Sequence, residues 1–538
     1  MEAQGDVRCP NAGDAYAVTN EIANDVARSP TDLWPRPIRT PSMDESLQIT
    51  GGPGIHRYVM SVPAVHGHYL VDPRELIGLT LLLGAYVASF ADKQAEYVRL
   101  LNIVGPSALA VILLLGCWWQ FTGEQRSLWQ PLLWFRLACV TYYGVGALVP
   151  YGVNDTTVQS IRSLYPFSDE EGFKVGLINV CCILAVLLAA AVFSRQRNLL
   201  APNPRAAAQS NTLLFAAAFL IVGGITRYLI VLPSSLGFTD IVPGSVLPLA
   251  KSYVVGLFLL VVAGLRGSRI ALSLALVLIP VDLVLGLLTF AKTEVLITLI
   301  FSYLGVLHHN LNRSRVLVGA ALVVALYAQV DPIIHFGRNE LQRRNGNLGG
   351  TLEQRLDILN LYLDGASKVA TEPETQSAFS RLSYVNAAAM VVSWYDSGKT
   401  GESLDYALTV FVPRFIWPDK PVITSVGEDL YTAATAQTGS SISPGLFAEA
   451  YWNLGWLGIP VLMIPLGIIL AVFSRYSLAM MGHERWLHMP VILLGVWAGI
   501  RVDGWYVADV IGGCSMALAF ALAIFAIENT LGRGSRRR

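Results

Sequence analysis

The sequence predicts an all-α polytopic membrane protein with about 12 transmembrane helices and one large helical loop on the far side of the membrane. Of the 538 residues, 54% are apolar and only 14% are charged, whereas a soluble domain carries about 25% charged residues. Too few polar groups therefore remain to cover a globular surface. Apolar runs of about 16–22 residues recur, each long enough to cross a bilayer as a helix. One long stretch, 333–450, lacks such a run.

The chain divides into a tail, two helical regions and the loop between them. Residues 1–72 are rich in Pro, Gly, Asp and Ser and contain no signal-peptide core, so we expect a disordered cytoplasmic tail. Nine transmembrane helices are expected within 73–332 and three within 451–530, before a basic cytoplasmic tail at 531–538. The expected spans are 76–91, 102–121, 129–150, 175–194, 213–232, 245–265, 270–290, 294–309, 316–332, 451–474, 489–501 and 507–527.

Basic residues in the short loops predict that both termini are cytoplasmic. Cytoplasmic loops carry an excess of Lys and Arg. With the N-terminus inside, the inner loops and the C-terminal tail hold about fourteen basic residues and the short outer loops about six. The inner set includes Arg126, Arg195, Arg197, Arg205, Arg266, Arg269, Arg313, Arg315, Arg475 and Arg485, and the outer set is Lys93, Arg99, Arg162, Lys174, Lys292 and Arg501.

The long loop is expected to contain helices of its own, because a structureless loop of this length is improbable. Four leucines recur at helical spacing, at positions 352, 356, 359 and 363. They predict an amphipathic helix that lies on the membrane surface or packs against the bundle. A second helix is expected over about 381–395, ending at Asp396-Ser397-Gly398.

Charged residues inside apolar spans cost several kcal/mol unless they are paired or hydrated. Most of them fall at the expected outer ends of their helices, which predicts one polar cavity that faces outward beneath the loop. The alternative is that the cations extend to the lipid headgroups. The set is Arg227, Lys251, Asp282, Lys292, Glu294, Asp331, Arg501 and Asp503, with Arg136 in the inner half of its span.

The loop begins with a basic segment that contains His335, Arg338, Arg343 and Arg344. The planar guanidinium of arginine suits phosphate or diphosphate oxygens. Contact with lipid headgroups is the alternative for these arginines. His335 is the one histidine expected outside the membrane, and it is a candidate site residue beside the simpler possibility of a structural role.

Two short strings in the second half of the loop are the most distinctive. In 412–421, three prolines and the cations Arg414 and Lys420 flank Trp417. Proline prevents helix continuation, so this segment should be a rigid turn that orients both cations. In 447–458, Glu449 and Tyr451 precede an Asn-x-Gly-x-x-Gly pattern that enters the next span.

These strings resemble the Wzy-type oligosaccharide repeat-unit polymerases of O-antigen, exopolysaccharide and capsule assembly. Members show a Pro-Arg-x-Leu/Ile-Trp-Pro-x-Lys-Pro element, matched here by Pro413 to Pro421. They also show a Gly/Ala-Glu-x-Tyr-x-Asn-x-Gly-x-x-Gly element, matched by Ala448 to Gly458, and an arginine ahead of a helix, matched by Arg381 to Val392. The resemblance covers roughly 330–475.

The resemblance implies a GT-C-like glycosyltransferase of the bacterial inner membrane. It would move a growing glycan from undecaprenyl diphosphate onto a new lipid-linked repeat unit. Arg414 and Lys420 would then hold the diphosphate, and Glu449 or His335 would act as general base. The other expected substrate contacts are Arg338, Arg343, Arg344, Arg381, Trp417, Arg227, Lys292 and Tyr451. No cofactor and no metal are expected, because fixed cations can stabilise the leaving group.

The partners implied are undecaprenyl-diphosphate-linked oligosaccharides and membrane lipids, with the flippase and the chain-length regulator of the same pathway. Zero net charge argues against a nucleic-acid partner. Three alternatives remain open. An O-antigen ligase shares the topology and the lipid donor, a flippase or transporter would show inverted repeats that we do not find, and an assembly partner would leave the cations of 412–421 without a role.

Overall fold

A computed structural model describes residues 70–92, 95–121, 125–152, 166–194, 211–236, 246–346, 349–365, 382–412, 416–417, 420, 425–435 and 441–535. Every regular element in these ranges is a helix, which confirms the all-α prediction. Across the same ranges, nine helices are long and apolar enough to cross a membrane, and two shorter apolar helices, Leu249–Leu265 and Trp486–Ile500, accompany them. Arg381, Arg414 and the expected tail up to residue 69 lie outside the described residues.

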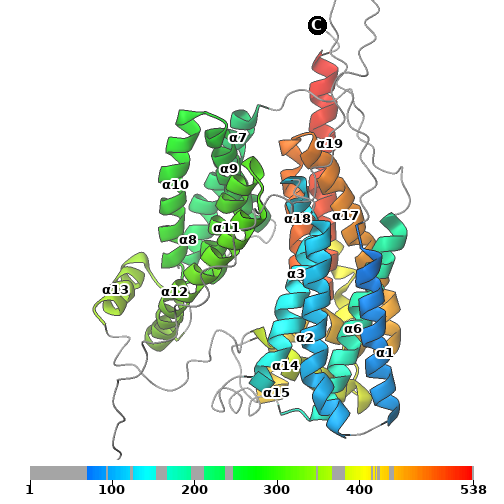
Figure 1. Cartoon of the computed structure of the whole chain (residues 1–538). Helices are drawn as coiled ribbons and strands as arrows, with labels where there is room; N and C mark the ends of the chain where they lie inside the picture. Colours follow the sequence, from blue (N-terminus) through cyan, green and yellow to red (C-terminus); the bar gives the residue numbers. More distant parts are fainter. Residues whose placement is uncertain are drawn as a thin grey trace, which may run out of the picture. The chain divides into compact units, whose positions relative to one another are not determined.

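One group of helices shares a large apolar core (Figure 1). It includes α1 (Pro73–Asp92), α2 (Ala95–Gln120), α3 (Pro131–Cys139), α6 (Asp169–Ser194), α14 (Val385–Asp396), α16 (Leu446–Leu454) and α17 (Ile464–Gly482). The short helix α4 (Gly146–Gly152) packs against α2. α18 (Met489–Ile500) packs against α3 and α17, and α19 (Gly512–Ser535) packs against α18. α15 (Ser425–Thr435) contributes Val426 and Leu430 to the same core.

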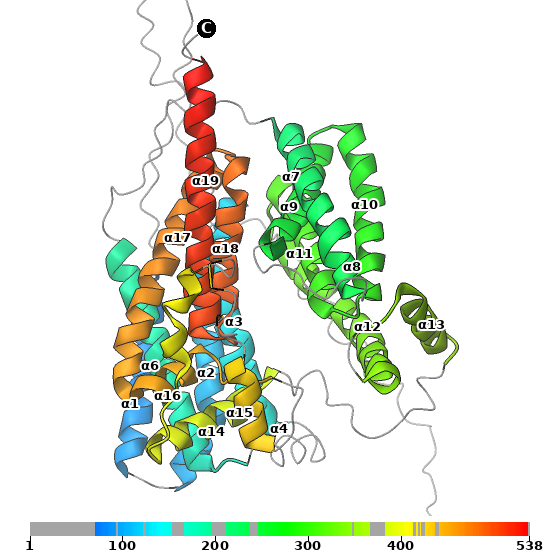
Figure 2. The same ribbon diagram turned by 180° about the vertical axis from the view of Figure 1, so that it is seen from behind.

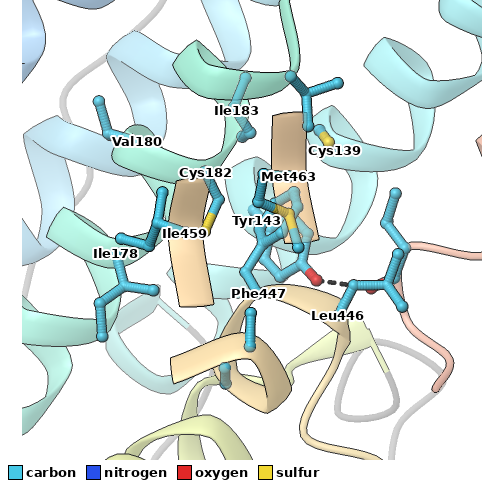
Figure 3. Close-up of a cluster of buried hydrophobic side chains, with 14 of the residues drawn as sticks. Cys139, Tyr143, Ile178, Val180, Cys182, Ile183, Leu446, Phe447, Ile459 and Met463 are labelled. Carbon is cyan, nitrogen blue, oxygen red and sulfur yellow. Dashed lines mark hydrogen bonds between the residues drawn. The ribbon is translucent and has the colours of Figure 1, made fainter. Parts of the chain in front are cut away.

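Aromatic side chains anchor α16 inside this core (Figure 3). The ring of Phe447 stacks on Tyr143, with centroids 4.6 Å apart. The Tyr143 hydroxyl donates a hydrogen bond of 2.6 Å to the carbonyl of Val502. Tyr143 belongs to a π-helical segment, Val140–Val145, that interrupts the third expected span. α16 is therefore tied both to that segment and to the turn after α18.

A second group of helices lies between α6 and α14 in the chain, and several of its members pack against α9 (Figures 1 and 2). Gly223 of α7 lies against the backbone of α9, because a Cβ there would approach the Tyr253 nitrogen to 2.1 Å. Small residues at such positions let membrane helices approach closely. The group comprises α7 (Thr212–Thr226), α8 (Leu232–Ser235), α9 (Val246–Leu265), α10 (Arg269–Leu288), α11 (Lys292–His309), α12 (Arg313–Asn345) and α13 (Leu352–Leu363).

Two helices differ from the expected boundaries. The expected span 316–332 was wrong at its end, because α12 continues through Pro332 to Asn345. Membrane helices tolerate an internal proline where neighbouring groups satisfy the freed carbonyl. The expected span 451–474 is interrupted at Gly455, whose φ of 58° ends α16. The next α-helix, α17, then continues to Gly482.

Two helices expected in the loop are present. α13 covers Leu352–Leu363 and begins with a capping box between Thr351 and Gln354. It buries Arg355 and Ile358, whereas three of the four leucines of the predicted repeat, at 352, 356 and 363, are exposed. α14 (Val385–Asp396) ends at the expected Asp396 and packs against α6 and α16. In Figures 1 and 2, α14 lies toward the end of its helix group that is opposite to the last turn of α19.

Candidate functional site

A cavity of about 440 Å³ is lined by α9 and α11, by α18, and by the segment that begins α19. α18 lines it from Pro490 to Ile500, which corresponds to about 15 Å along a helix axis. Ile297, Phe301 and Leu304 of α11 add further apolar wall. The cavity is therefore elongated, and most of its surface suits hydrocarbon rather than water.

Polar side chains gather at one end of this cavity. Lys251 and Ser252 come from the beginning of α9, and Asp509 comes from the π-helical segment Tyr506–Ile511 that precedes α19. Trp497, near the end of α18, lines the same region, because the Lys251 ammonium lies 4.0 Å from its ring centroid. A hydrocarbon wall with one polar end is the shape that an amphiphilic ligand requires.

Lys251 is the notable cation of this cavity. Its contact with the Trp497 ring provides cation–π stabilisation. Among the described residues, no carboxylate comes within ion-pair distance of Lys251, and Glu294 and Asp509 act on it only at longer range. A half-buried ammonium without a counter-charge is unfavourable in an apolar surrounding. It is correspondingly well suited to receive an anionic ligand.

Asp509 is held rigidly at the cavity wall. Arg501 Nε donates to Asp509 Oδ1 at 3.0 Å, and Arg501 Nη2 donates to Oδ2 at 3.4 Å. The Trp505 backbone N–H donates to Oδ2 at 2.9 Å. A Cβ on Gly504 would lie 1.9 Å from that oxygen, so only glycine leaves room for the carboxylate. Single π-helical turns are frequent at functional sites.

Glu449, expected as a general base, is enclosed in the protein. Its side chain is 0% exposed. Ser403 Oγ donates to Oε1 at 2.6 Å, and the Tyr506 N–H donates to Oε2 at 2.6 Å. Asn453 Nδ2 donates to Ser403 Oγ and completes the network. Burial raises the pKa of Glu449 to about 7. Glu449 thus fixes the start of the segment that bears Asp509.

The segment that leads into the Pro413–Pro421 element reaches the cavity. Val410, in the short helix Thr409–Phe411, belongs to the lining. Of the element itself, Lys420 Nζ donates to the Val412 carbonyl at 3.1 Å. Trp417 is 41% exposed. The expected contacts Arg414 and Arg381 fall on residues that are not described.

A second polar cluster joins α10, α11 and the end of α7. Asp282 is fully buried, and its carboxylate accepts hydrogen bonds from Arg227, Tyr228 and Thr298. The other guanidinium branch of Arg227 donates to Glu294 at 2.5 Å. The expected contact Arg227 is therefore saturated by carboxylates of neighbouring helices, which fits a role in holding these helices together.

Two further expected residues, Lys292 and His335, contact each other. Lys292 forms an ion pair with Asp331 of α12, and its Nζ lies 3.1 Å from His335 Nε2. His335 and Asp331 are one helical turn apart, 3.6 Å between Nε2 and Oδ2. Across the described part of the chain, no group of three or more His, Cys, Asp or Glu side chains has the geometry of a metal site.

The remaining expected contacts lie elsewhere. Arg343 and Arg344 pair with Glu340 at the end of α12, and Arg344 also reaches Asp357 of α13. Arg338 lies on α12, five residues before Arg343, and is half-buried. The Tyr451 hydroxyl donates to Asp396, which also pairs with Lys174. These contacts are not part of the cavity lining.

Sequence reasoning did not single out Asp509, Ser403 or Glu75. Asp509 left a weak signal, as a carboxylate at the start of an apolar run. Glu75 explains the charge expected in the inner half of a span, because it holds Arg136 through bonds of 2.6 and 2.9 Å with both side chains fully buried. No local pattern could have revealed that pair, whose members are 61 positions apart.

The family model described as Domain of unknown function (DUF8712) matches residues 207–497. This range is more than half of the chain, and the chain belongs to that family. It includes Lys251, Glu449 and Trp497, whereas Asp509 follows it. No curated protein matches the chain, and no solved structure matches it.

Proposed function

We propose that this protein is a membrane glycosyltransferase that polymerises oligosaccharide repeat units. It transfers a growing glycan from undecaprenyl diphosphate to a new lipid-linked repeat unit on the periplasmic face. The observation that supports the proposal is the elongated apolar cavity with Lys251 at its polar end. The segment leading into the Pro413–Pro421 element, which resembles the polymerase family, lines this same cavity through Val410.

The cavity suits a polyprenyl diphosphate in both of its parts. A polyprenyl chain that enters from the bilayer remains in apolar surroundings along the cavity walls, so its transfer into the cavity costs little free energy. A diphosphate needs cations that water does not fully screen. Lys251 lacks an ion-pair partner among the described residues, so binding a diphosphate would restore its missing counter-charge.

Because the lipid diphosphate is a good leaving group, the protein mainly has to position the two substrates and stabilise the developing negative charge. A hydroxyl of the acceptor attacks the anomeric carbon of the donor, and the lipid diphosphate leaves. Stabilising the charge that develops on the leaving oxygen is commonly the largest catalytic contribution. Lys251 supplies one fixed cation, and the resemblance assigns Arg414 and Lys420 as two more.

The finer architecture is part of the same proposal. Twelve spans result if α9, α11 and α18 cross the membrane beside the nine helices that are long and apolar enough to do so. The resemblance to the polymerase family implies a GT-C-like arrangement of these spans. Both termini are then cytoplasmic, and the location is the bacterial inner membrane. The flippase and the chain-length regulator of the pathway are the partners that such an enzyme requires.

Product analysis tests the function against its alternatives. In a deletion strain, single repeat units should reach the cell surface and long polymer should be absent, and the full-length chain should restore the polymer. A surface without any repeat unit, with full-length polymer held on the lipid, would indicate a ligase. Repeat units retained on the cytoplasmic face would indicate a flippase. Unchanged glycan would refute all three.

A further inference from the structure

We infer that Asp509 is the general base that takes the proton from the attacking hydroxyl, and that Arg501 is the residue that positions it. The inference rests on the proposed function and deepens it. It differs from the expectation drawn from the sequence, which named Glu449 or His335 for this step.

The first argument is that Asp509 is accessible to a substrate in the cavity, whereas Glu449 and His335 are not. Asp509 lines the cavity that we assign to the lipid-linked substrate. Glu449 is completely buried and does not belong to the cavity lining. His335 is bound to Lys292 and lies on α12, outside the cavity lining. A base must come within hydrogen-bond reach of the proton that it removes, and the cavity offers this contact to Asp509.

Orientation is the second argument. Arg501 and the Trp505 N–H fix both oxygens of Asp509, as a catalytic base requires. Each carboxylate oxygen has two lone pairs. Oδ1 accepts the single bond of 3.0 Å from Arg501 in the described structure. One lone pair of Oδ1 therefore remains for the substrate hydroxyl.

Space beside Asp509 is the third argument. Gly512 and Gly513, three and four positions after it, also line the cavity. A Cβ on Gly513 would find no atom within 4 Å, and a Cβ on Gly512 would find none closer than 3.6 Å. The absence of two side chains leaves room for a sugar ring next to the carboxylate.

The step balances without a further reactant. The acceptor oxygen forms a bond to the anomeric carbon as the bond from that carbon to the diphosphate oxygen breaks. The electron pair of the broken bond remains on the diphosphate, close to Lys251. The proton of the acceptor hydroxyl moves to Asp509 Oδ1 and is later released to water.

The test compares two carboxylates that share one arginine. Asp503 Oδ2 lies 3.9 Å from Arg501 Nη1, but Asp503 does not line the cavity. Full-length Asp509→Asn, Asp509→Glu and Asp503→Asn should be purified beside the wild type. The substrate is the set of lipid-linked oligosaccharides that accumulates in the deletion strain. Undecaprenyl diphosphate serves as a separate binding probe.

Asp509→Asn should lower kcat by about 100-fold or more, with KM and undecaprenyl diphosphate binding within about threefold of the wild type. Asp503→Asn should retain most of the activity. Asp509→Glu keeps a carboxylate and should retain part of the activity, so it serves as the test if Asp509→Asn folds poorly. Arg501→Lys should lower kcat while KM changes little.

Two outcomes overturn the inference alone. One is an active wild type with an equally active Asp509→Asn variant. The other is an equal loss of kcat in Asp503→Asn and Asp509→Asn that follows their thermal stability, which would make Asp509 a structural partner of Arg501. A well-folded wild type without any transfer would overturn the proposed function, and the inference with it.

Discussion

The Lys251 ammonium lies 4.0 Å from the centroid of the Trp497 ring, a contact between α9 and α18 at the polar end of the cavity. Lys251→Met keeps the apolar stem and removes the charge. A charge-assisted contact is worth about 1.5–3 kcal/mol, so the variant should bind undecaprenyl diphosphate about 10–100-fold more weakly. Lys251→Arg should retain most of the affinity. Binding is measured by titration of the purified full chain.

Lys399 provides a matched control for Lys251. Its ammonium also faces an indole, 5.9 Å from the Trp394 ring centroid, but it is exposed and does not line the cavity. Lys399→Met should leave the affinity unchanged. Equal losses in both variants would mean that general surface charge, rather than the cavity, attracts the ligand.

The raised pKa of Glu449 leads us to expect a specific dependence of the free energy of unfolding on pH. Burial raises its pKa from the ordinary 4.5 to about 7. Between these values the folded chain keeps a proton that the unfolded chain releases, so stability should fall as pH rises through this window and level off above it. Glu449→Gln cannot titrate, so its Tm should fall less over the window. Parallel Tm curves of variant and wild type from pH 5 to 8 would contradict this.

Glu449→Ala tests the network around the same carboxylate. It leaves the Ser403 hydroxyl and the Tyr506 N–H without their acceptor. Each unsatisfied buried group costs about 1–3 kcal/mol. The Ala variant should therefore unfold at a clearly lower temperature than Glu449→Gln, and a Tm equal to that of the Gln variant would show that the network adds little.

The buried pair Glu75–Arg136 should behave as a unit. Arg136→Met alone leaves the Glu75 carboxylate without its cation in a fully buried position. Removing one partner of such a pair costs about 3–5 kcal/mol. The double variant Glu75→Gln with Arg136→Met should recover much of that loss, because no charge then remains buried. Thermal unfolding of Glu75→Gln, of Arg136→Met and of the double variant gives the coupling, and additive losses would argue against it.

Arg414 is predicted from the resemblance to hold the diphosphate through its planar guanidinium. Arg414→Ala should leave expression and membrane insertion near wild type and abolish long polymer, with a rate loss of about two to three orders of magnitude. Arg414→Lys should recover only part of the activity. A fully active Lys variant at matched expression would assign Arg414 to headgroup attraction instead.

The orientation of the chain is tested with reporter fusions. The distribution of basic residues predicts that positions 200, 267, 312 and 480 are cytoplasmic, whereas 160, 238, 345, 400 and 435 are outside. An alkaline-phosphatase fusion should be active at 400 and inactive at 312. The reverse pattern would invert the proposed topology and move the polar end of the cavity to the cytoplasmic face.

Local signals in the sequence located many elements correctly. α1 begins at Pro73, where the composition changes from polar to apolar. α13 covers the predicted leucine repeat, because helical periodicity and a capping box act within a few residues. The end expected for the helix at 316–332 was wrong, since Pro332 stays inside α12. Whether a proline ends a membrane helix depends on neighbours that local sequence does not specify.

The sequence by itself determined that this chain is an all-helical membrane protein with charges near particular helix ends, because composition and periodicity act locally. Only the tertiary structure decided which charges are paired and which line a cavity. Glu449 and Asp509 look alike in sequence, each a lone carboxylate beside an apolar run. Ser403, 46 positions away from Glu449, helps to enclose it, whereas Asp509 opens onto a cavity shared with Lys251 of α9. Burial and pairing depend on residues distant in the chain, so they become defined only when the helices pack.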